Sequence, residues 1–175
     1  MKRERFLDRP GFDPPDAIFM RIALYQPDIP QNMGAMMRIG ACFRLPVDVI
    51  EPCGFPFDEK RLRRTAMDYG AACTLVRHRS WAAFLETIMR PPQRLILLTT
   101  AAETSHADFA FGPDDTLLLG RESSGVPAEV HAAADHCVRI PIAGELRSLN
   151  VAVAGAIVAA EALRQRGVFT GKVAL

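Results

Sequence analysis

Two polar side chains of chemical interest, Asn32 and Arg38, follow the first apolar run of the chain, which ends at Tyr25. Arg38 has methionine, isoleucine and alanine as neighbours, so its guanidinium stands in an apolar setting. Such a permanent cation, with its fork of N–H donors, suggests that an anion binds nearby. The ordinary alternatives are a helix cap for Asn32 and a solvated or ion-paired side chain for Arg38.

Two further polar segments also follow apolar runs. In G-R-E-S-S-G-V-P, Gly120 and Gly125 permit positive φ and the close approach of a ligand, while Glu122 could accept hydrogen bonds from amine or hydroxyl groups. In R-S-L-N, Ser148 or Asn150 could cap the next helix by accepting a hydrogen bond from a free backbone N–H of its first turn. Each segment alone is a weak signal, because glycine turns and capped helices are both common.

Four cations lie within five positions of the segment F-D-E-K-R-L-R-R-T-A-M-D-Y, in a chain whose net charge is only +1. Such a run usually forms the solvated face of a helix. In a nearly neutral protein it also offers a local patch for phosphates. The candidate phosphate-binding residues are Lys60, Arg61, Arg63 and Arg64.

The polar segments lie between alternating strand-like and helix-like stretches. Short apolar runs predict buried strands at residues 19–25, 47–50, 73–76, 95–99, 116–119 and 137–142. Helices are predicted at residues 34–43, 58–67, 81–89 and 151–162, with a short one after Pro127. This alternation predicts an α/β fold with a mainly parallel sheet and flanking helices. Ligands of such sheets bind beyond the carboxyl ends of the strands, where the polar segments lie.

The predicted C-terminal helix is unusual, because it is small or apolar on every face apart from Glu161. Its alanines and Gly155 leave little side-chain bulk, so another backbone can approach closely. The partner is either the protein's own sheet or a second copy of the chain.

Length and composition narrow the remaining possibilities. With 175 residues, 49% of them hydrophobic, the chain can bury one sizeable core, which suggests a single domain at residues 18–175. Residues 1–17 are charged and proline-rich and are expected to form a flexible leader. Four widely spaced cysteines without a C-x-x-C pair indicate reduced thiols in a cytoplasmic protein, and no metal site is expected. No run reaches the roughly 18 apolar residues of a membrane span.

Taken in order, three segments resemble the motifs of the SPOUT class of RNA methyltransferases. They are P-x-x-P-Q-N-M-G-A-M-M-R, L-L-L-G-R-E-S-S-G-V-P, and R-I-P-I followed by R-S-L-N. The likeness is strongest to the small members that methylate the ribose 2′-oxygen of the wobble nucleotide of tRNA, cytidine or uridine 34. The basic segment is also similar to a basic helix of that subfamily, and the resemblance covers residues 21–167.

This resemblance implies a parallel α/β fold with a C-terminal trefoil knot, a homodimer, and S-adenosylmethionine bound in the knot. The helix after Asn150 becomes the expected dimer contact, and the basic segment is expected to bind the anticodon stem-loop of tRNA. The implied catalytic residues are Arg38, Asn32, Ser148 and Asn150. The implied cofactor-binding residues are Leu98, Gly120, Glu122, Ile140 and Ser148.

Methyl transfer to a ribose requires alignment of the hydroxyl and removal of its proton. Arg38 is a poor base, because a guanidinium stays protonated above pH 12. We therefore expect Arg38 to hold a phosphate and to stabilise the developing alkoxide rather than to abstract the proton.

Other functions fit parts of the same sequence. The chain has N-M-G-A where relatives often have N-T-G-N, so 2′-O-methylation of another tRNA position or of ribosomal RNA is the main alternative. A non-catalytic RNA-binding protein on the same fold is an alternative of a different class. A nucleotide-dependent oxidoreductase is not expected, because no G-x-G-x-x-G follows any predicted strand.

Overall fold

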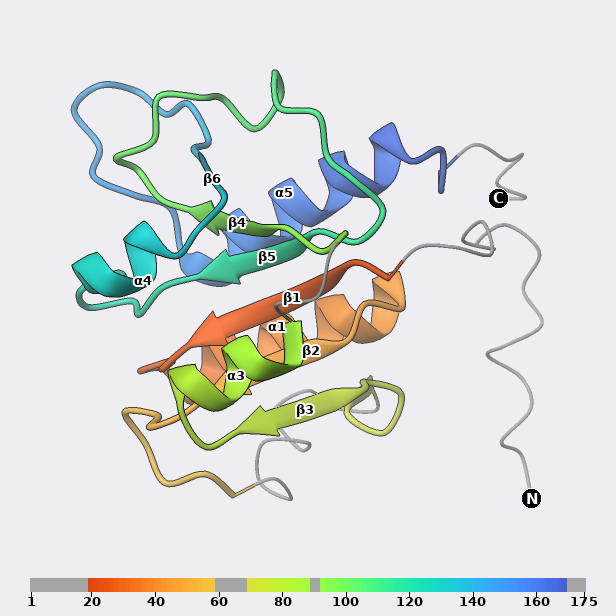
Figure 1. Cartoon of the computed structure of the whole chain (residues 1–175), viewed down its shortest axis with the longest axis vertical. Helices are drawn as coiled ribbons and strands as arrows, with labels where there is room; N and C mark the ends of the chain where they lie inside the picture. Colours follow the sequence, from red (N-terminus) through yellow and green to blue (C-terminus); the bar gives the residue numbers. More distant parts are fainter. Residues whose placement is uncertain (1–18, 59–68, 89–91, 170–175) are drawn as a thin grey trace.

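The computed structural model describes residues 19–58, 69–88 and 92–169. Within them, six strands form one sheet in the order β3-β2-β1-β5-β4-β6 (Figure 1). The pairings between these strands are all parallel, which confirms the predicted α/β class. The strands are β1 (Arg21–Tyr25), β2 (Val47–Ile50), β3 (Leu75–His78), β4 (Leu95–Leu98), β5 (Thr116–Leu119) and β6 (His136–Val138).

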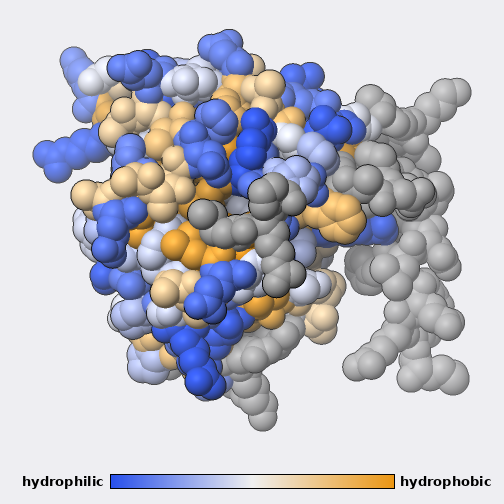
Figure 2. Space-filling view, in the orientation of Figure 1, coloured by the Kyte–Doolittle hydropathy of each residue, from blue (hydrophilic) through white to orange (hydrophobic). Residues whose placement is uncertain are grey.

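Helices cover both faces of the sheet. One face packs against α1 (Pro30–Phe43) and α5 (Val151–Gln165). The other packs against α3 (Trp81–Ile88) and the short α4 (Ala128–Ala132) (Figure 1). Figure 2 views the α3 face and shows hydrophobic residues near its middle with hydrophilic residues around them. Burial of the sheet on both faces explains why its strands read as continuous apolar runs.

The last strand is shorter than its apolar sequence predicts. Only the first residues of the run 137–142 belong to β6, and Arg139 then forms an isolated bridge with Ser105. Beyond that bridge the chain leaves the sheet, and Ile140 and Ile142 line a cavity instead of extending the strand.

The first helix starts earlier than predicted, and Asn32 is not its cap. α1 begins at Pro30, whose fixed φ suits the first helical position, and the N-cap residue Ile29 makes no side-chain capping bond. Asn32 therefore lies inside the first turn, where it is only 9% exposed. The alternative of a cap at Asn32 is not met, because Pro30 already takes the first helical position.

A glycine brings α5 close to α1 and β5. A Cβ atom at Gly155 would lie 2.8 Å from Met36 Cε and 2.9 Å from Leu119 Cδ2, so the bare backbone permits both contacts. Another side of the helix leaves Val153 48% and Ile157 37% exposed. The small-residue helix thus packs on its own sheet and still presents an apolar strip outward.

Three sequence predictions lie outside the described residues. They are the leader at residues 1–17, the helix at residues 58–67 apart from its first residue, and the basic patch of Lys60, Arg61, Arg63 and Arg64. Among the helices that the structure does describe, none is both long enough and apolar enough to cross a membrane. In the same residues, no group of three His, Cys, Asp or Glu side chains could hold a metal ion.

Candidate active site

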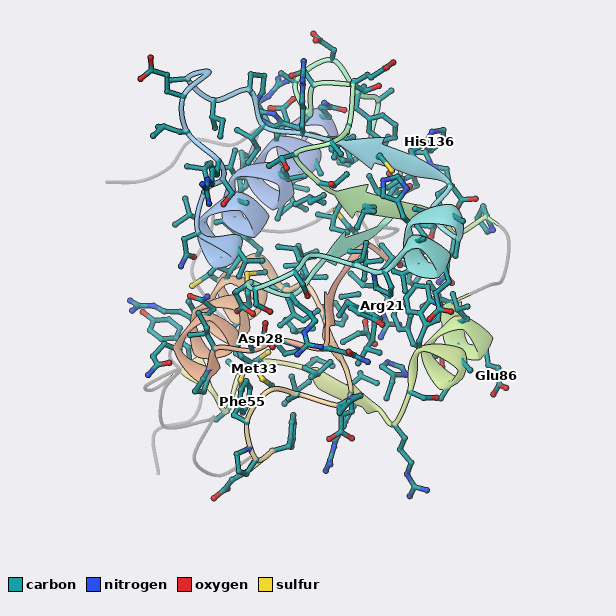
Figure 3. The ribbon with its side chains drawn as sticks, turned by 90° about the vertical axis from the view of Figure 1, so that its left-hand side faces the viewer. Arg21, Asp28, Met33, Phe55, Glu86 and His136 are labelled. Carbon is teal, nitrogen blue, oxygen red and sulfur yellow. The ribbon has the colours of Figure 1, made fainter. Side chains whose placement is uncertain are left out.

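A cavity of about 510 Å³ lies at the carboxyl ends of β4, β5 and β6. Its walls come from the segments that follow these strands and from the start of α5. Figure 3 views the molecule from this edge of the sheet, and the labelled Asp28 and Met33 mark the start of α1. Three separate loops therefore meet at one place, as the parallel sheet predicts.

Most of the site residues predicted from the sequence line this cavity. All the predicted cofactor-binding residues do so, as do all the predicted catalytic residues except Arg38. Their roles in binding and catalysis stay predictions. The cavity-lining members are Asn32, Leu98, Gly120, Glu122, Ile140, Ser148 and Asn150.

Asn150 caps α5 and fixes the direction of its own amide. Its Oδ1 accepts hydrogen bonds from the backbone N–H groups of Ala152 at 2.9 Å and Val153 at 3.2 Å. From the sequence, either Ser148 or Asn150 could cap α5, and the structure shows that Asn150 is the cap. With the oxygen used in this way, the amide nitrogen points away from the helix, and Asn150 Nδ2 donates to Asn32 Oδ1 at 2.9 Å.

The hydrogen bond from Asn150 also fixes which way the Asn32 amide faces, so that Asn32 donates to Glu122. Since Asn32 Oδ1 accepts from Asn150, its Nδ2 is the donor, and it donates to Glu122 Oε1 at 3.0 Å. The second carboxylate oxygen, Glu122 Oε2, accepts from the backbone N–H of Asp28 at 2.7 Å. Glu122 therefore joins the turn after β5 to the start of α1, while it also lines the cavity.

An ion pair stands beside this chain of hydrogen bonds. Arg121 donates from Nη2 to Asp28 Oδ1 at 2.8 Å and from Nη1 to Gln26 Oε1 at 3.3 Å. Hydrogen bonds from Arg121 and then from Ser123 lower the pKa of the Asp28 carboxyl to about 2. Asp28 was missed in the sequence, although a carboxylate in the loop after β1 was an available signal.

Two glycines shape the turn that carries Glu122. The backbone N–H of Arg121 donates to Gly125 O at 2.8 Å, and the N–H of Gly125 donates to Arg121 O at 2.9 Å. Gly125 has a φ of 67°, as expected for this turn. A Cβ atom at Gly120 would lie 2.7 Å from the carbonyl carbon of Gly125, so Gly120 lets the turn close on itself.

Arg38 points elsewhere. It lies six residues after Asn32, which places it about 9 Å further along the helix axis and about a third of a turn around it. Its side chain is exposed, and its guanidinium carbon lies 4.7 Å from the centroid of the Tyr69 ring. The expectation that Arg38 lies beside Asn32 in one site is therefore not met within a single chain.

Residues 20–160 match the model of the SpoU rRNA Methylase family. The chain belongs to this family. It is 53% identical over 146 residues to the tRNA (cytidine(34)-2′-O)-methyltransferase of Beijerinckia indica, a match that covers 83% of this chain and 91% of that protein. It is 39% identical over 150 residues to the protein of the same name from Escherichia coli K12, covering 85% and 94%.

Solved structures give the same assignment. A structure concerned with the 2-OH methylation of C/U34 on tRNA superposes on this SpoU-family chain with a TM-score of 0.78, at 40% identity, covering 83% of this chain and 95% of the other. AviRb of Streptomyces viridochromogenes, a SpoU methyltransferase in complex with its cofactor AdoMet, gives a TM-score of 0.78 at 25% identity, covering 90% of this chain and 66% of the other. The resemblance stated from the sequence motifs is confirmed.

Hydroxyl side chains of the SpoU-family cavity, Ser148 among them, are left available to a ligand. Ser148 is exposed and lines the cavity, and within the described residues its hydroxyl makes no hydrogen bond. Asn32, Asn150 and Glu122 are instead engaged with one another. The site thus combines a hydrogen-bonded set of amide and carboxylate groups with hydroxyls that are free to meet a ligand.

Proposed function

We propose that this protein transfers a methyl group from S-adenosylmethionine to the ribose 2′-hydroxyl of the wobble nucleotide, cytidine or uridine 34, of tRNA in the cytoplasm. The observation that carries the proposal is the meeting of three motif loops at one cavity through Asn150, Asn32 and Glu122. The choice of substrate is supported by the two relatives named above, which are tRNA (cytidine(34)-2′-O)-methyltransferases.

The cavity suits S-adenosylmethionine in size and in the chemistry of its walls. Its volume of about 510 Å³ is typical of small-ligand sites. Ile140 and Ile142 offer apolar surface to an adenine ring, and the Ser148 hydroxyl can bond a polar end of the ligand. When bound, the cofactor supplies a methyl group activated on a positively charged sulfur. The residues we assign to its binding are Leu98, Gly120, Glu122, Ile140 and Ser148.

Arg38 is the residue we assign to the reacting ribose. A ribose hydroxyl attacks poorly until its proton is drawn away, and the negative charge that grows on its oxygen needs a nearby donor. Arg38 cannot supply the base, but it can hold a backbone phosphate and stabilise that charge. Asn32 and Asn150 would keep the loops around the cavity aligned, which is the other part of the rate enhancement.

We propose that the protein works as a homodimer through α5. The exposed Val153 and Ile157 give that helix an apolar strip, and small neighbours allow a second backbone to approach. A dimer would also account for Arg38, which does not line the cavity of its own chain. In this arrangement one copy's Arg38 serves the cavity of the other copy.

We further propose that residues 18–175 form one domain after a leader at residues 1–17, and that the C-terminal segment is threaded into a trefoil knot. The knot is proposed from the likeness to the SPOUT motifs, and the loop between β4 and β5 is bonded to the end of α5. Gln165 accepts from Phe111 N at 3.0 Å and donates to Phe109 O at 3.0 Å.

We assign the anticodon stem-loop contact to Lys60, Arg61, Arg63 and Arg64.

The test is to incubate the purified protein with labelled S-adenosylmethionine and total tRNA, and then to map the methylated ribose. Label should appear at nucleotide 34 of a subset of tRNAs. A matched reaction with Arg38→Ala should lose methyl transfer while the cofactor dissociation constant, measured by titration calorimetry, changes less than about twofold. A product outside the anticodon loop would rule out the wobble assignment, and a cofactor that fails to raise the melting temperature would favour a non-catalytic RNA-binding protein.

A further inference from the structure

Arg38 has free hydrogen-bond donors and one aromatic contact. Within the part of the chain that the structure describes, its guanidinium forms no hydrogen bond and no ion pair. Its contact is the face of the Tyr69 ring, whose centroid lies 4.7 Å from Arg38 Cζ. An arginine held by its flat face keeps all five N–H donors at its edges, where they can meet a phosphate or an oxyanion.

Tyr69 begins a hydrogen-bonded turn that leads into the core. The turn at residues 69–72 is closed by a hydrogen bond from Ala72 N to Tyr69 O at 3.0 Å, and it leads directly to the buried Cys73. A Cβ atom at Gly40 would lie 3.7 Å from Cys73 Sγ and only 2.8 Å from Leu45 O. The bare backbone of Gly40 therefore admits the chain that returns at Leu45, while Cys73 lies at ordinary contact distance from α1, the helix that carries Arg38.

Arg38 meets the ring of Tyr69 and not its hydroxyl. In the described residues it makes no hydrogen bond, and the aromatic face alone meets the guanidinium. A phenylalanine at this position keeps the ring, whereas a leucine keeps only the bulk. The chain thus offers a conservative and a disruptive change that differ in one property, the π face.

We propose that Tyr69 is a positioning residue for methyl transfer: its ring holds the Arg38 guanidinium with the N–H edges turned toward the RNA. The inference rests on the proposed function of Arg38. A long side chain that is restrained before the substrate arrives loses less freedom when it binds, so the restraint favours the reacting arrangement. The pair is joined across 31 positions of sequence by the contact of the 69–72 turn with α1.

The test compares Tyr69→Phe and Tyr69→Leu with the wild-type protein. For each we would measure kcat, the KM for tRNA, the cofactor dissociation constant and the melting temperature. Tyr69→Phe should keep kcat within about twofold. Tyr69→Leu should lower kcat roughly fivefold, the upper size expected of a cation–π contact at an exposed site. Cofactor affinity and melting temperature should be unchanged in both variants.

A double substitution shows whether Tyr69 acts through Arg38. Arg38→Lys keeps the charge but loses the planar fork, so some transfer should survive. Adding Tyr69→Leu to that variant should change kcat by less than about twofold, because the stacked guanidinium is already gone.

The outcomes separate this inference from the proposed function. Equal kcat values for Tyr69→Phe and Tyr69→Leu would overturn the positioning role while leaving the methyltransferase assignment intact. The same holds if Tyr69→Leu lowers the melting temperature and kcat together, or if its effect persists in full beside Arg38→Lys. A wild-type protein that methylates no RNA would overturn both.

Discussion

The two ends of α5 are each joined to distant parts of the chain by a side-chain amide, but the partners differ in kind. At the first end, Asn150 bonds another side chain, Asn32, which in turn bonds Glu122. At the other end, Gln165 bonds only backbone of the loop after β4, at Phe109 and Phe111, together with Glu161 of its own helix. The first end of α5 lines the cavity, whereas the far end is hydrogen-bonded to the loop after β4.

This difference predicts that changes at one end of α5 affect the reaction and changes at the other end affect stability. At the first end, the bond from Asn150 to the Asn32 side chain can be removed while the Asn150 oxygen still caps α5. Alterations of the side-chain bonds at this end should therefore act on the reaction. A side chain that pairs backbone N–H and C=O groups replaces part of the secondary structure, and its loss exposes unpaired backbone. Alterations at the far end should therefore act on stability.

Among the variants that test this comparison, the largest effect is expected at Glu122. In Glu122→Gln the shape is kept, but an NH2 group must face either Asp28 N or Asn32 Nδ2, both of which are donors. A charged acceptor that serves two donors is worth roughly 3 kcal/mol, so kcat should fall about 100-fold. Single-turnover methyl transfer measures this loss.

The control for Glu122→Gln is Glu86→Gln, at an exposed position of α3 far from the cavity. It should leave both transfer and stability unchanged. Near-normal transfer by Glu122→Gln would mean that the alignment of the three loops does not depend on this carboxylate.

Substitutions of Asn150 also disrupt the hydrogen bonds at the first end of α5. Asn150→Asp keeps the oxygen that caps α5 and adds a favourable charge at the helix N-terminus, but it removes the donor to Asn32. Methyl transfer should fall roughly tenfold with no loss of melting temperature. Asn150→Ala removes the cap as well and should cost about 1 kcal/mol of unfolding free energy.

The pair of variants separates capping from alignment. If Asn150→Asp transfers methyl groups like the wild type, while Asn150→Ala does not, then the cap alone accounts for the role of Asn150.

At the far end, Gln165→Leu should act on stability and not on the reaction. Phe111 N and Phe109 O would lose their partner, which costs about 1–2 kcal/mol for a partly buried site. Urea unfolding should show this loss, while kcat well below the melting temperature stays within about twofold. Glu86→Leu, which places the same side chain at an exposed helical position, is the control.

A fall in kcat comparable to that of Asn150→Asp would contradict the comparison. It would show that the loop after β4, which also carries cavity residue Thr99, transmits disorder from the far end of the helix to the site.

The elements of the fold were predictable wherever the pattern is local. The apolar runs at residues 47–50 and 116–119 match β2 and β5 residue for residue, because each is buried on both faces. The early end of β6 was not predictable, since Ile140 and Ile142 are as apolar as strand residues and only the cavity explains their placement.

The site was predictable as a set of residue types but not as a geometry. Three loops after strands pointed to Asn32, Glu122 and Asn150, yet the direction of the hydrogen bonds among them depends on the α5 cap. The offset of Arg38 from Asn32 follows from helix geometry, but its contact with Tyr69 depends on how a distant turn lies against α1. Such contacts join residues far apart in sequence and leave no periodic signal.

The smallest effects are expected from two carboxyls, Asp28 near the cavity and Glu161 at the far end of α5. Hydrogen bonds from Arg121 and Ser123 lower the pKa of Asp28 to about 2. Hydrogen bonds from Arg164 and Gln165 lower the pKa of Glu161 to about 2 as well. Since these folded-state values lie below the ordinary value, each ion pair stabilises the fold above about pH 4. That stabilisation is lost as the pH falls toward 2. Asp28→Asn and Glu161→Gln should therefore each cost under about 1 kcal/mol at pH 7 and less as the pH falls.

Urea titrations of both variants at pH 7, 4 and 3 measure this trend, and a cost that grows on acidification would reverse the assigned sign.

Methyl transfer by the same two variants at pH 7 then extends the comparison between the two ends of α5. Asp28→Asn should lower kcat a few-fold, because the ion pair with Arg121 positions the turn that carries Glu122. Glu161→Gln should leave kcat unchanged, because its partners lie at the end of α5 that does not line the cavity. Equal losses of kcat in the two variants would mean that general stability, and not the position of the turn, limits the reaction.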